Sequence, residues 1–244
     1  MFIKNNVTGS YPLVIHAPDE SEIWHDIMRR FNAMPCHEAT NSDQLLIITW
    51  NNFKTSPLEE CLEKRKIPFK AMGKEVTVWN NLQKFNLNLD AIKYSNCKYA
   101  MGLDAHDVLF IGDPAEAVRR FEETDCDLLF NCETNFYPDF PIDYYVENKA
   151  FQTKVGKGKY RYLNSGSWIG KSEFCKEFFE ECRKVRLWEM FDCTGRLNLY
   201  NCDQSVVHSI FKKYHPRVQL DYSCRIFFNI SLIDRSEIGF LKWQ

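Results

Sequence analysis

The sequence predicts an α/β fold with a Rossmann-like, mostly parallel central sheet flanked by helices. The first observation is a series of short runs rich in aliphatic and aromatic residues, at 45–50, 99–103 and 127–132. Such runs are typical of strands buried on both faces. The second observation is that helical patterns separate these runs, which gives the order β, α, β, α, β. This alternation favours a doubly wound or related topology.

Two segments between the strands carry the start signals of helices. In Ser56-Pro57-Leu58-Glu59 and in Asp113-Pro114-Ala115-Glu116, a capping residue precedes a proline at the first helical position. The first of these helices should end before Pro68, because the residue before a proline disfavours helical geometry. Further helices are expected to start near Ser172 and near Asp203.

Two other segments are interpreted from their composition and spacing. Residues 135–160 combine aromatics, prolines and glycines, and we predict a long loop there, of the kind that often carries substrate contacts. Val76, Trp79 and Leu82 recur at helical spacing and predict a helix that faces the core.

The composition is that of a compact globular protein. With 244 residues, of which 45% are hydrophobic, the chain can bury one substantial core, and we expect one domain spanning residues 1–244. A formal net charge of −2 argues against a protein that coats nucleic-acid duplexes through bulk positive charge. The ten cysteines include no Cys-x-x-Cys pair, so we interpret them as mostly reduced core residues.

The sequence also leads to an expectation about location. No stretch approaches the ~20 apolar residues that a membrane-spanning helix requires. The first residues, Met1–Asn6, lack an apolar signal segment. We therefore expect a cytoplasmic protein without a membrane span; its oligomeric state is not indicated.

An aspartate pair marks the end of the second apolar run. Asp104 and Asp107 emerge at the strand edge where α/β sheets usually bind ligands. Hard cations such as Mg²⁺ or Mn²⁺ take carboxylate ligands together with substrate phosphates, so this Asp-x-x-Asp could hold a metal–diphosphate. The same two residues would also fit simple turn or capping roles. His106, between them, would point to the opposite face if the segment stays extended.

Other segments extend this pair into a longer pattern. They are Cys132–Pro138, Tyr162–Gly170, Cys202-Asp203-Gln204 and Leu220–Phe227. Together with Asp104, and in this order, they resemble the glycosyltransferase domain of the procollagen lysyl hydroxylases, from about Leu45 to Lys242. The resemblance implies a GT-A fold and an enzyme that moves a hexose from UDP-glucose or UDP-galactose to an acceptor hydroxyl, with retention at the anomeric carbon.

The resemblance also implies the site residues. Asp104 and Asp107 would bind Mn²⁺ or Mg²⁺. Contacts to the nucleotide sugar would come from Thr49, Trp50, Asn52, Lys74, Asp104 and His106, the last at the position of a nucleotide-stacking tyrosine of the family. Catalytic roles would fall to Asp203, Glu133 and Asn164, and contacts to the transferred sugar or the acceptor to Tyr137 and Gln204. Tyr137 stands where the family has a tryptophan.

Each of these matches also has a purely structural explanation. Glu133 could be a solvated strand end, Tyr137 a loop-packing aromatic, and Asn164 part of a simple turn. Asp203 opens a helical run and would also serve as an N-cap, and Trp50 could be a core aromatic.

The family has a further metal-binding histidine after its last shared strand, whereas this chain stops at Gln244. The N-terminal segment from Phe2 through Ala17 resembles that missing strand, the histidine and the turn after it, and the capping pattern Asp19–Glu22 predicts a helix that follows. We therefore predict a circular permutation, in which residues 1–32 are the family's C-terminal segment and His16 completes the metal site. The alternative is an unrelated strand in which His16 is an ordinary strand-end residue.

The acceptor is left open by these observations. A protein hydroxylysine, another glycan, a nucleobase or a small molecule would each supply the hydroxyl. A glycosyltransferase acting on hydroxylated nucleobases in DNA would favour the basic run of Lys154, Lys157, Lys159 and Arg161, although such a run also suits a solvated loop. Two further classes of protein would fit the same residues, a non-catalytic nucleotide-sugar binding module and a nucleotidyltransferase.

Overall fold

A mostly parallel sheet forms the centre of the protein. The computed structural model describes residues 2–18, 21–35, 37–139, 143–186 and 202–241. Within these residues, the sheet has six strands in the order β4-β3-β5-β8-β7-β9. In chain order they are β3 (Leu45–Trp50), β4 (Lys70–Met72), β5 (Tyr99–Asp104), β7 (Leu128–Glu133), β8 (Tyr162–Lys171) and β9 (Val218–Leu220). Only β8 runs antiparallel to its neighbours, so the predicted fold class is confirmed.

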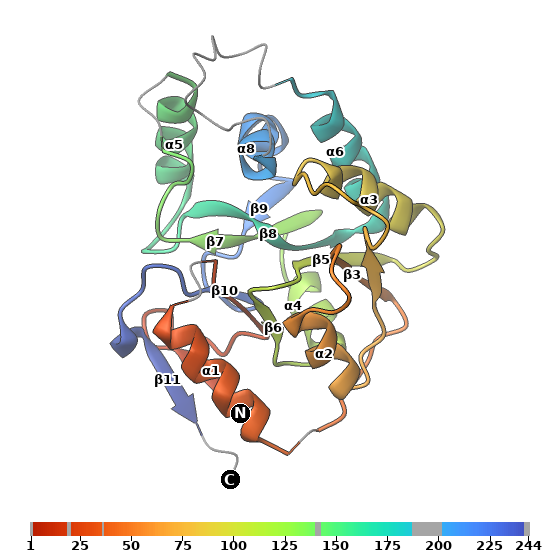
Figure 1. Ribbon diagram of the computed structural model, residues 1–244. Coiled ribbons are helices and arrows are strands. Elements are labelled where there is room, and N and C mark those ends of the chain that lie inside the picture. Colours follow the sequence, from red (N-terminus) through yellow and green to blue (C-terminus); the bar gives the residue numbers. More distant parts are fainter. Residues whose placement is uncertain (1, 19–20, 36, 140–142, 187–201, 242–244) are drawn as a thin grey trace.

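Helices cover both faces of this sheet (Figure 1). On one face lie α3 (Gln83–Lys93), α5 (Asp143–Val155), α6 (Ser172–Lys184) and α8 (Asp203–Tyr214). On the other lie α1 (Glu22–Ala33), α2 (Pro57–Lys64) and α4 (Pro114–Glu122). Among the described helices, none combines the length and the apolar character needed to cross a membrane.

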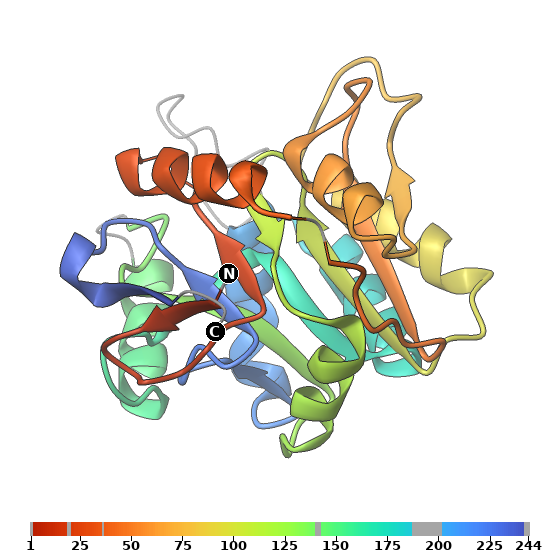
Figure 2. The ribbon, with the colours of Figure 1, turned by 90° about the horizontal axis from the view of Figure 1, so that it is seen from below.

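A small second sheet joins the two ends of the chain. Its order is β10-β2-β6, with β2 (Val14–His16) lying between β10 (Phe227–Asn229) and β6 (Val108–Phe110). β1 (Phe2–Asn5) pairs antiparallel with β11 (Ile238–Leu241), which follows the short 3₁₀ helix η2 (Arg235–Glu237). The N- and C-terminal segments therefore lie side by side (Figure 2). This arrangement carries His16, at the end of β2, next to the strand that follows Asp107.

The helix starts predicted from the sequence are confirmed. The Ser56 hydroxyl accepts a hydrogen bond from the Glu59 backbone N–H, and α2 ends well before Pro68. The helices α4, α6 and α8 begin at Pro114, Ser172 and Asp203, as expected. No disulfide joins the cysteines that the structure describes, and most of them are buried, as expected for reduced core residues.

The prediction of a long loop over residues 135–160 was wrong, because the whole of helix α5 lies within it. Only two of its side chains, Tyr145 and Gln152, are buried, so the segment lacks the apolar stripe that marks a surface helix. Tertiary hydrogen bonds fix it instead. The Tyr145 hydroxyl lies 3.0 Å from Ser205 Oγ, and Gln152 Nε2 lies 2.7 Å from His208 Nδ1.

The predicted helix through Val76, Trp79 and Leu82 was also wrong, since α3 begins only at Gln83. The Asn80 side-chain oxygen accepts a hydrogen bond from the Leu82 backbone N–H. Such a local bond competes with helical geometry and holds a turn just before α3. Trp79 and Leu82 still pack against the core, which accounts for their apolar character without a helix.

Candidate functional site

The predicted site residues gather at one edge of the central sheet. The parallel strands β3, β5 and β7 end there at Trp50, Asp104 and Glu133. Trp50 pairs with Asp104, and Glu133 pairs with Tyr162, where the antiparallel strand β8 begins. The carboxyl ends of parallel strands are the usual ligand-binding edge of such a sheet, because side chains from several strands converge there.

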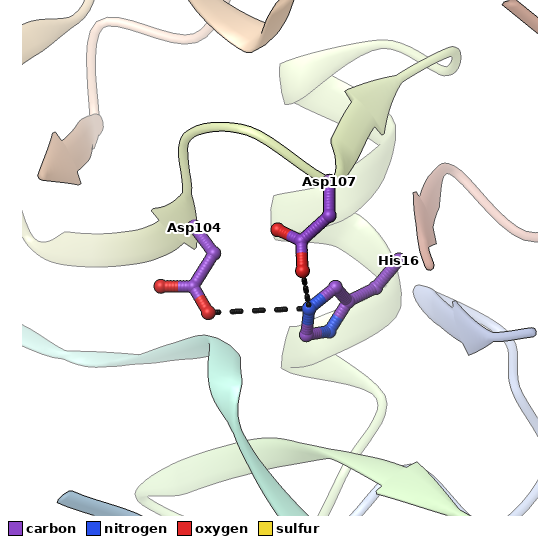
Figure 3. Close-up of side chains that lie close together, drawn as sticks. All are labelled: His16, Asp104 and Asp107. Atoms are coloured by element: carbon purple, nitrogen blue, oxygen red, sulfur yellow. Dashed lines mark hydrogen bonds and ion pairs between the residues drawn. The ribbon is translucent and has the colours of Figure 1, made fainter. Parts of the chain in front are cut away.

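Three potential metal ligands meet at this edge (Figure 3). His16 Nε2 lies 3.2 Å from Asp107 Oδ2 and 3.9 Å from Asp104 Oδ2. Within the described part of the chain, this is the one group of three such side chains whose ligand atoms all lie within 4.8 Å of one another. Atoms that share a cation at about 2.0–2.5 Å lie about 3–5 Å apart, so the spacing suits a shared cation.

Gly166 leaves the space that this cluster needs. Leu103 pairs with Ser167 across the sheet, which brings Gly166 opposite the end of β5. A Cβ atom at Gly166 would lie 2.4 Å from Asp104 Oδ2 and 2.4 Å from His16 Cε1. Any side chain there would displace the ligands, so the residue types and the space both fit a bound cation.

Lys84 lies beside the cluster, and no pattern in the sequence pointed to it. Its Nζ is 2.6 Å from Asp104 Oδ1 and 3.4 Å from Asp203 Oδ2, and the side chain is buried. Burial alone would lower the pKa of Lys84, but the two facing carboxylates, Asp104 foremost, raise it well above its ordinary value. The amine is therefore a fixed positive charge.

Opposing effects set the charge of the three ligands. Burial acts to lower the pKa of His16, but Asp107 and Asp104 raise it more, so the net shift is upward. Burial acts to raise the pKa of Asp107, but the contact with His16 brings it below its ordinary value. For Asp104, burial dominates and the pKa is raised despite Lys84. A cation that binds His16 Nε2 must displace a proton from it.

A buried amide holds the second nitrogen of the imidazole. Asn131, on β7, places its Nδ2 3.1 Å from His16 Nδ1 and is fully buried. Its side-chain oxygen accepts a hydrogen bond of 2.8 Å from the Cys132 backbone N–H, which fixes the amide. The amino group of Asn131 therefore faces Nδ1, whereas a histidine that binds a cation through Nε2 carries its proton on Nδ1 and needs an acceptor there, so cation binding requires this amide to turn. No sequence pattern pointed to Asn131.

Glu133 lies deeper in the same site, among amides. Gln204 Nε2 donates to Glu133 Oε1 over 2.8 Å, and Asn164 Nδ2 lies 3.5 Å from Glu133 Oε2. Burial raises the pKa of Glu133 to about 7, against the opposing effects of Gln204, His16 and Asn164. Glu133 is thus a buried carboxyl that changes charge near neutral pH, and its interpretation as a solvated strand end was wrong.

The Asp203 carboxylate points toward the strands. The N-cap of α8 is Cys202, and Asp203 is the first helical residue. Ser165 Oγ donates to Asp203 Oδ2 over 3.1 Å, and Lys84 contacts the same oxygen. The side chain therefore joins the cluster and does not cap its helix.

Two cavities meet at this cluster. The smaller one has a volume of about 490 Å³ and the larger one about 680 Å³. The smaller is lined by Trp50, Asn51, Asn52, Phe53, Trp79, Ala105 and His106. The larger is lined by residues that include His16, Glu133, Tyr137, Asn164, Gly166, Asp203, Gln204 and Leu232. Asn81, Lys84, Asp104 and Asp107 line both cavities and form their common wall.

Of the residues predicted to form the site, Thr49 and Lys74 are the two that line neither cavity. Thr49 is fully buried within β3. Lys74 Nζ lies 2.8 Å from both Glu59 carboxylate oxygens and 2.8 Å from the Phe53 backbone oxygen. Their contacts to the nucleotide sugar stay predictions. His106 occupies an exposed bend, and its ring meets Phe53 edge to face at 5.0 Å.

A mostly parallel sheet with paired aspartates at its carboxyl edge, between two cavities, suits a glycosyltransferase domain. The chain belongs to the PLOD GT domain family, a glycosyltransferase family, whose family model matches residues 78–238. The fold is accordingly of the GT-A type. The matched segment includes Lys84, Asp104 and Asp203, but neither Trp50 nor His16.

Known relatives are similar over half of the chain. Procollagen-lysine,2-oxoglutarate 5-dioxygenase 1 of Mus musculus is 29% identical over 132 residues, which is 52% of this chain and 15% of that protein. The Homo sapiens protein of the same name is 30% identical over 134 residues, with the same coverage of 52% and 15%. The matches thus span about 15% of the length of these relatives. The solved structure of A197 from STIV is 15% identical in sequence, and the match covers 73% of this chain and 82% of that chain. Its TM-score of 0.39 is too low to support an argument.

The ligand cluster gives a first prediction. Replacing His16 with alanine removes one of three ligand atoms, so we expect Mn²⁺ to bind about tenfold or more weakly. Titration calorimetry of Mn²⁺ into the native and variant chains measures this. His25→Ala, which changes an exposed histidine on α1, is the matched control. Equal affinity for the native chain and His16→Ala would show that His16 is no ligand.

Proposed function

We propose that this chain is a metal-dependent glycosyltransferase that moves a hexose, glucose or galactose, from a UDP-sugar to an acceptor hydroxyl. The observation that carries the proposal is the meeting of two cavities at Asp104, Asp107 and Lys84. A nucleotide sugar has the same layout. Its diphosphate lies in the middle, with the nucleoside on one side and the sugar on the other.

The smaller cavity suits the nucleoside. Trp50 and His106 line it with aromatic rings, and Asn52 lines it with an amide. Aromatic rings stack on nucleobases, and amides hydrogen-bond to their edges. Asn52 Nδ2 donates to the Val76 backbone oxygen over 3.2 Å, which leaves its side-chain oxygen to accept a bond from a ligand.

The common wall suits the diphosphate. His16, Asp104 and Asp107 would hold Mn²⁺ or Mg²⁺, which when bound would offset the negative charge of the diphosphate. Lys84 adds a second positive charge at the same place, and its two carboxylate partners hold the amine in position. A buried amine in a fixed position stabilises a departing anion without first having to reorganise.

The larger cavity suits the sugar and the acceptor. Asp203 and Glu133 are the two carboxyl groups that line it apart from the proposed ligands. In a retaining transfer one of them would stabilise the positive charge that develops on the sugar, and in an inverting transfer one would accept the proton of the acceptor hydroxyl. Asn164 and Gln204 hold Glu133 in place for either role.

Exposed apolar side chains line the entrance to the larger cavity. Tyr137 is 64% exposed and Leu232 is 73% exposed. Leu232 also holds a φ of +54°, which residues other than glycine and asparagine rarely adopt. Strained residues at the edge of a cavity are typical of ligand contacts. These side chains favour an acceptor that brings a ring or an apolar stem next to its hydroxyl.

We further propose that residues 1–32 are a circularly permuted segment of the family domain, within a single domain. Three observations support this origin. β1 pairs with β11, so the two chain ends are adjacent, and β2 lies beside β10, the last strand before η2. His16, outside the matched segment, lies 3.2 Å from Asp107. Closely spaced chain ends allow permutation without loss of the fold.

The direct test of the function is release of UDP from UDP-sugars. We expect the native chain with Mn²⁺ to release UDP from UDP-glucose or UDP-galactose, because glycosyltransferases slowly transfer sugar to water. Asp104→Ala and Asp107→Ala should each lower the rate about a hundredfold or more, since each removes a ligand. Asp90→Ala, which changes an exposed aspartate on α3, should leave the rate unchanged.

Two different results would each point to another class of protein. Saturable binding of UDP-sugars without UDP release, even when candidate acceptors are added, would indicate a non-catalytic binding module. Release of pyrophosphate in place of UDP would indicate a nucleotidyltransferase.

The pKa of Glu133 gives a second kinetic prediction. Because this pKa is raised to about 7, the carboxyl is protonated below that pH and ionised above it. If the ionised form acts, the rate of UDP release should rise through pH 7, falling about tenfold for each pH unit below. Glu133→Gln should lower the rate of UDP release and make it independent of pH over this range. If the rate of UDP release by the native chain does not change between pH 6 and 8, the ionisation of Glu133 plays no part in the reaction.

The raised pKa of Glu133 also makes the stability of the folded state depend on pH. An unfolded glutamate titrates near its ordinary value of 4.5, so between that pH and about 7 the folded state binds more protons. The contribution of Glu133 to the free energy of unfolding should therefore decrease as pH rises across this range, so the native chain should lose more stability over it than Glu133→Gln does, as measured by denaturant unfolding at several pH values.

The permutation can be reversed. Phe2 pairs with Leu241, so a short linker can join the two ends, and new ends can be opened at Glu38, between α1 and β3. We expect the rearranged chain to keep Mn²⁺ binding within about threefold of the native chain, since His16 stays in place. A truncated chain that starts at Glu38 and lacks residues 1–37 should lose most of that affinity. Equal binding by the truncated chain would remove the N-terminal segment from the metal site.

A further inference from the structure

Helix α8 fixes the backbone of the segment that carries Tyr137. The Tyr137 backbone oxygen accepts a hydrogen bond of 2.7 Å from Gln204 Nε2 and lies 3.0 Å from His208 Nε2. Gln204 and His208 are one helical turn apart, so both reach the same carbonyl. The Tyr137 side chain, in contrast, is 64% exposed and lines the larger cavity. The backbone at Tyr137 is thus held in place, while its side chain stays exposed in the cavity.

The hydrogen-bond network specifies which nitrogen of His208 carries the proton. Gln152 Oε1 accepts a bond of 2.9 Å from the Leu163 backbone N–H, so its amino group faces His208 Nδ1 at 2.7 Å. An amino group only donates, which makes Nδ1 the acceptor and leaves the proton on Nε2. Nε2 therefore donates to the Tyr137 carbonyl.

The surroundings of His208 favour this neutral form of its imidazole. His208 is fully buried, and its ring lies 4.5 Å from the Phe136 ring at an interplanar angle of 30°. Burial lowers the pKa of His208 to about 4, so the ring stays neutral at ordinary pH. The chain of bonds runs from β8, through Gln152 on α5 and His208 on α8, to the loop after β7.

We propose that His208, held by Gln152 as its Nε2–H form, is a positioning residue that fixes the backbone at Tyr137 and so places its ring as a docking surface for the acceptor. The inference rests on the proposed function, because it assigns the larger cavity to the acceptor. His208 itself lines neither cavity and acts through the Tyr137 carbonyl.

Two substitutions separate the hydrogen bond from the packing. In His208→Gln, the side-chain amide can reach the position of Nε2 and still donate to Tyr137. In His208→Asn, the shorter amide reaches only the position of Nδ1. Both remove the ring and its contact with Phe136; the glutamine keeps the bond to Tyr137, whereas the asparagine keeps only the position that faces Gln152.

Hydrogen exchange measured by mass spectrometry gives the first readout. We expect exchange over residues 134–139 to become about tenfold faster in His208→Asn and to stay within about twofold of native in His208→Gln. Exchange over β5 should not change in either variant. Equal exchange in the two variants would overturn the proposal, as would nitrogen NMR showing the proton of His208 on Nδ1 in the native chain.

Kinetics give a readout that a general loss of stability would not produce. For an acceptor identified by transfer assays, the acceptor KM should rise about tenfold in His208→Asn and recover in His208→Gln. UDP release to water should stay unchanged in both variants, because water needs no docking surface. An unchanged acceptor KM in His208→Asn would overturn the acceptor role. A native chain that releases no UDP would instead contradict the proposed function, while the exchange comparison would still decide whether His208 holds the loop.

Discussion

The burial of several carboxylates at one edge of the sheet is the constraint on which the rest of the site depends. Asp104, Asp107 and Asp203 lie close together, and partly buried anions are costly unless positive charge faces them. Lys84 and His16 supply that charge from two elements far apart in the sequence. The positions of α3 and β2 are therefore tied to the charge of the site as well as to core packing.

The two cavities follow from the same arrangement. The wall between them is made of charged and amide side chains, while the distal part of the smaller cavity is aromatic and that of the larger one is rich in hydrogen-bonding groups. A ligand with an anionic centre and two dissimilar ends matches this distribution. The absence of a side chain at Gly166 leaves room for Asp104 in this wall, since a Cβ there would lie 2.4 Å from Asp104 Oδ2.

The sequence was sufficient for features carried by local patterns. The buried strands and the convergence of Asp104 and Glu133 follow from apolar runs and from the geometry of parallel strands, and the helix starts follow from local signals, although Asp113 makes no capping hydrogen bond. The sequence was insufficient where contacts between distant segments determine the local structure. The helix α5 lacks an apolar stripe, and Lys84 reads as an ordinary helical lysine until α3 is packed against the sheet. Asn131 is hidden in the same way, inside an apolar strand.

The pairing of the two chain ends also determines how the protein would respond to mechanical force. Phe2 lies opposite Leu241 in an antiparallel ladder, so tension applied at both ends would open the ladder one rung at a time, like a zipper. Once β1 had peeled away, the load would pass to β2 and His16, well before it reached the central sheet. Because β2 and β10 run parallel, the two chain ends would then pull along these strands in opposite directions, so this second pair would be loaded in shear and would not open rung by rung.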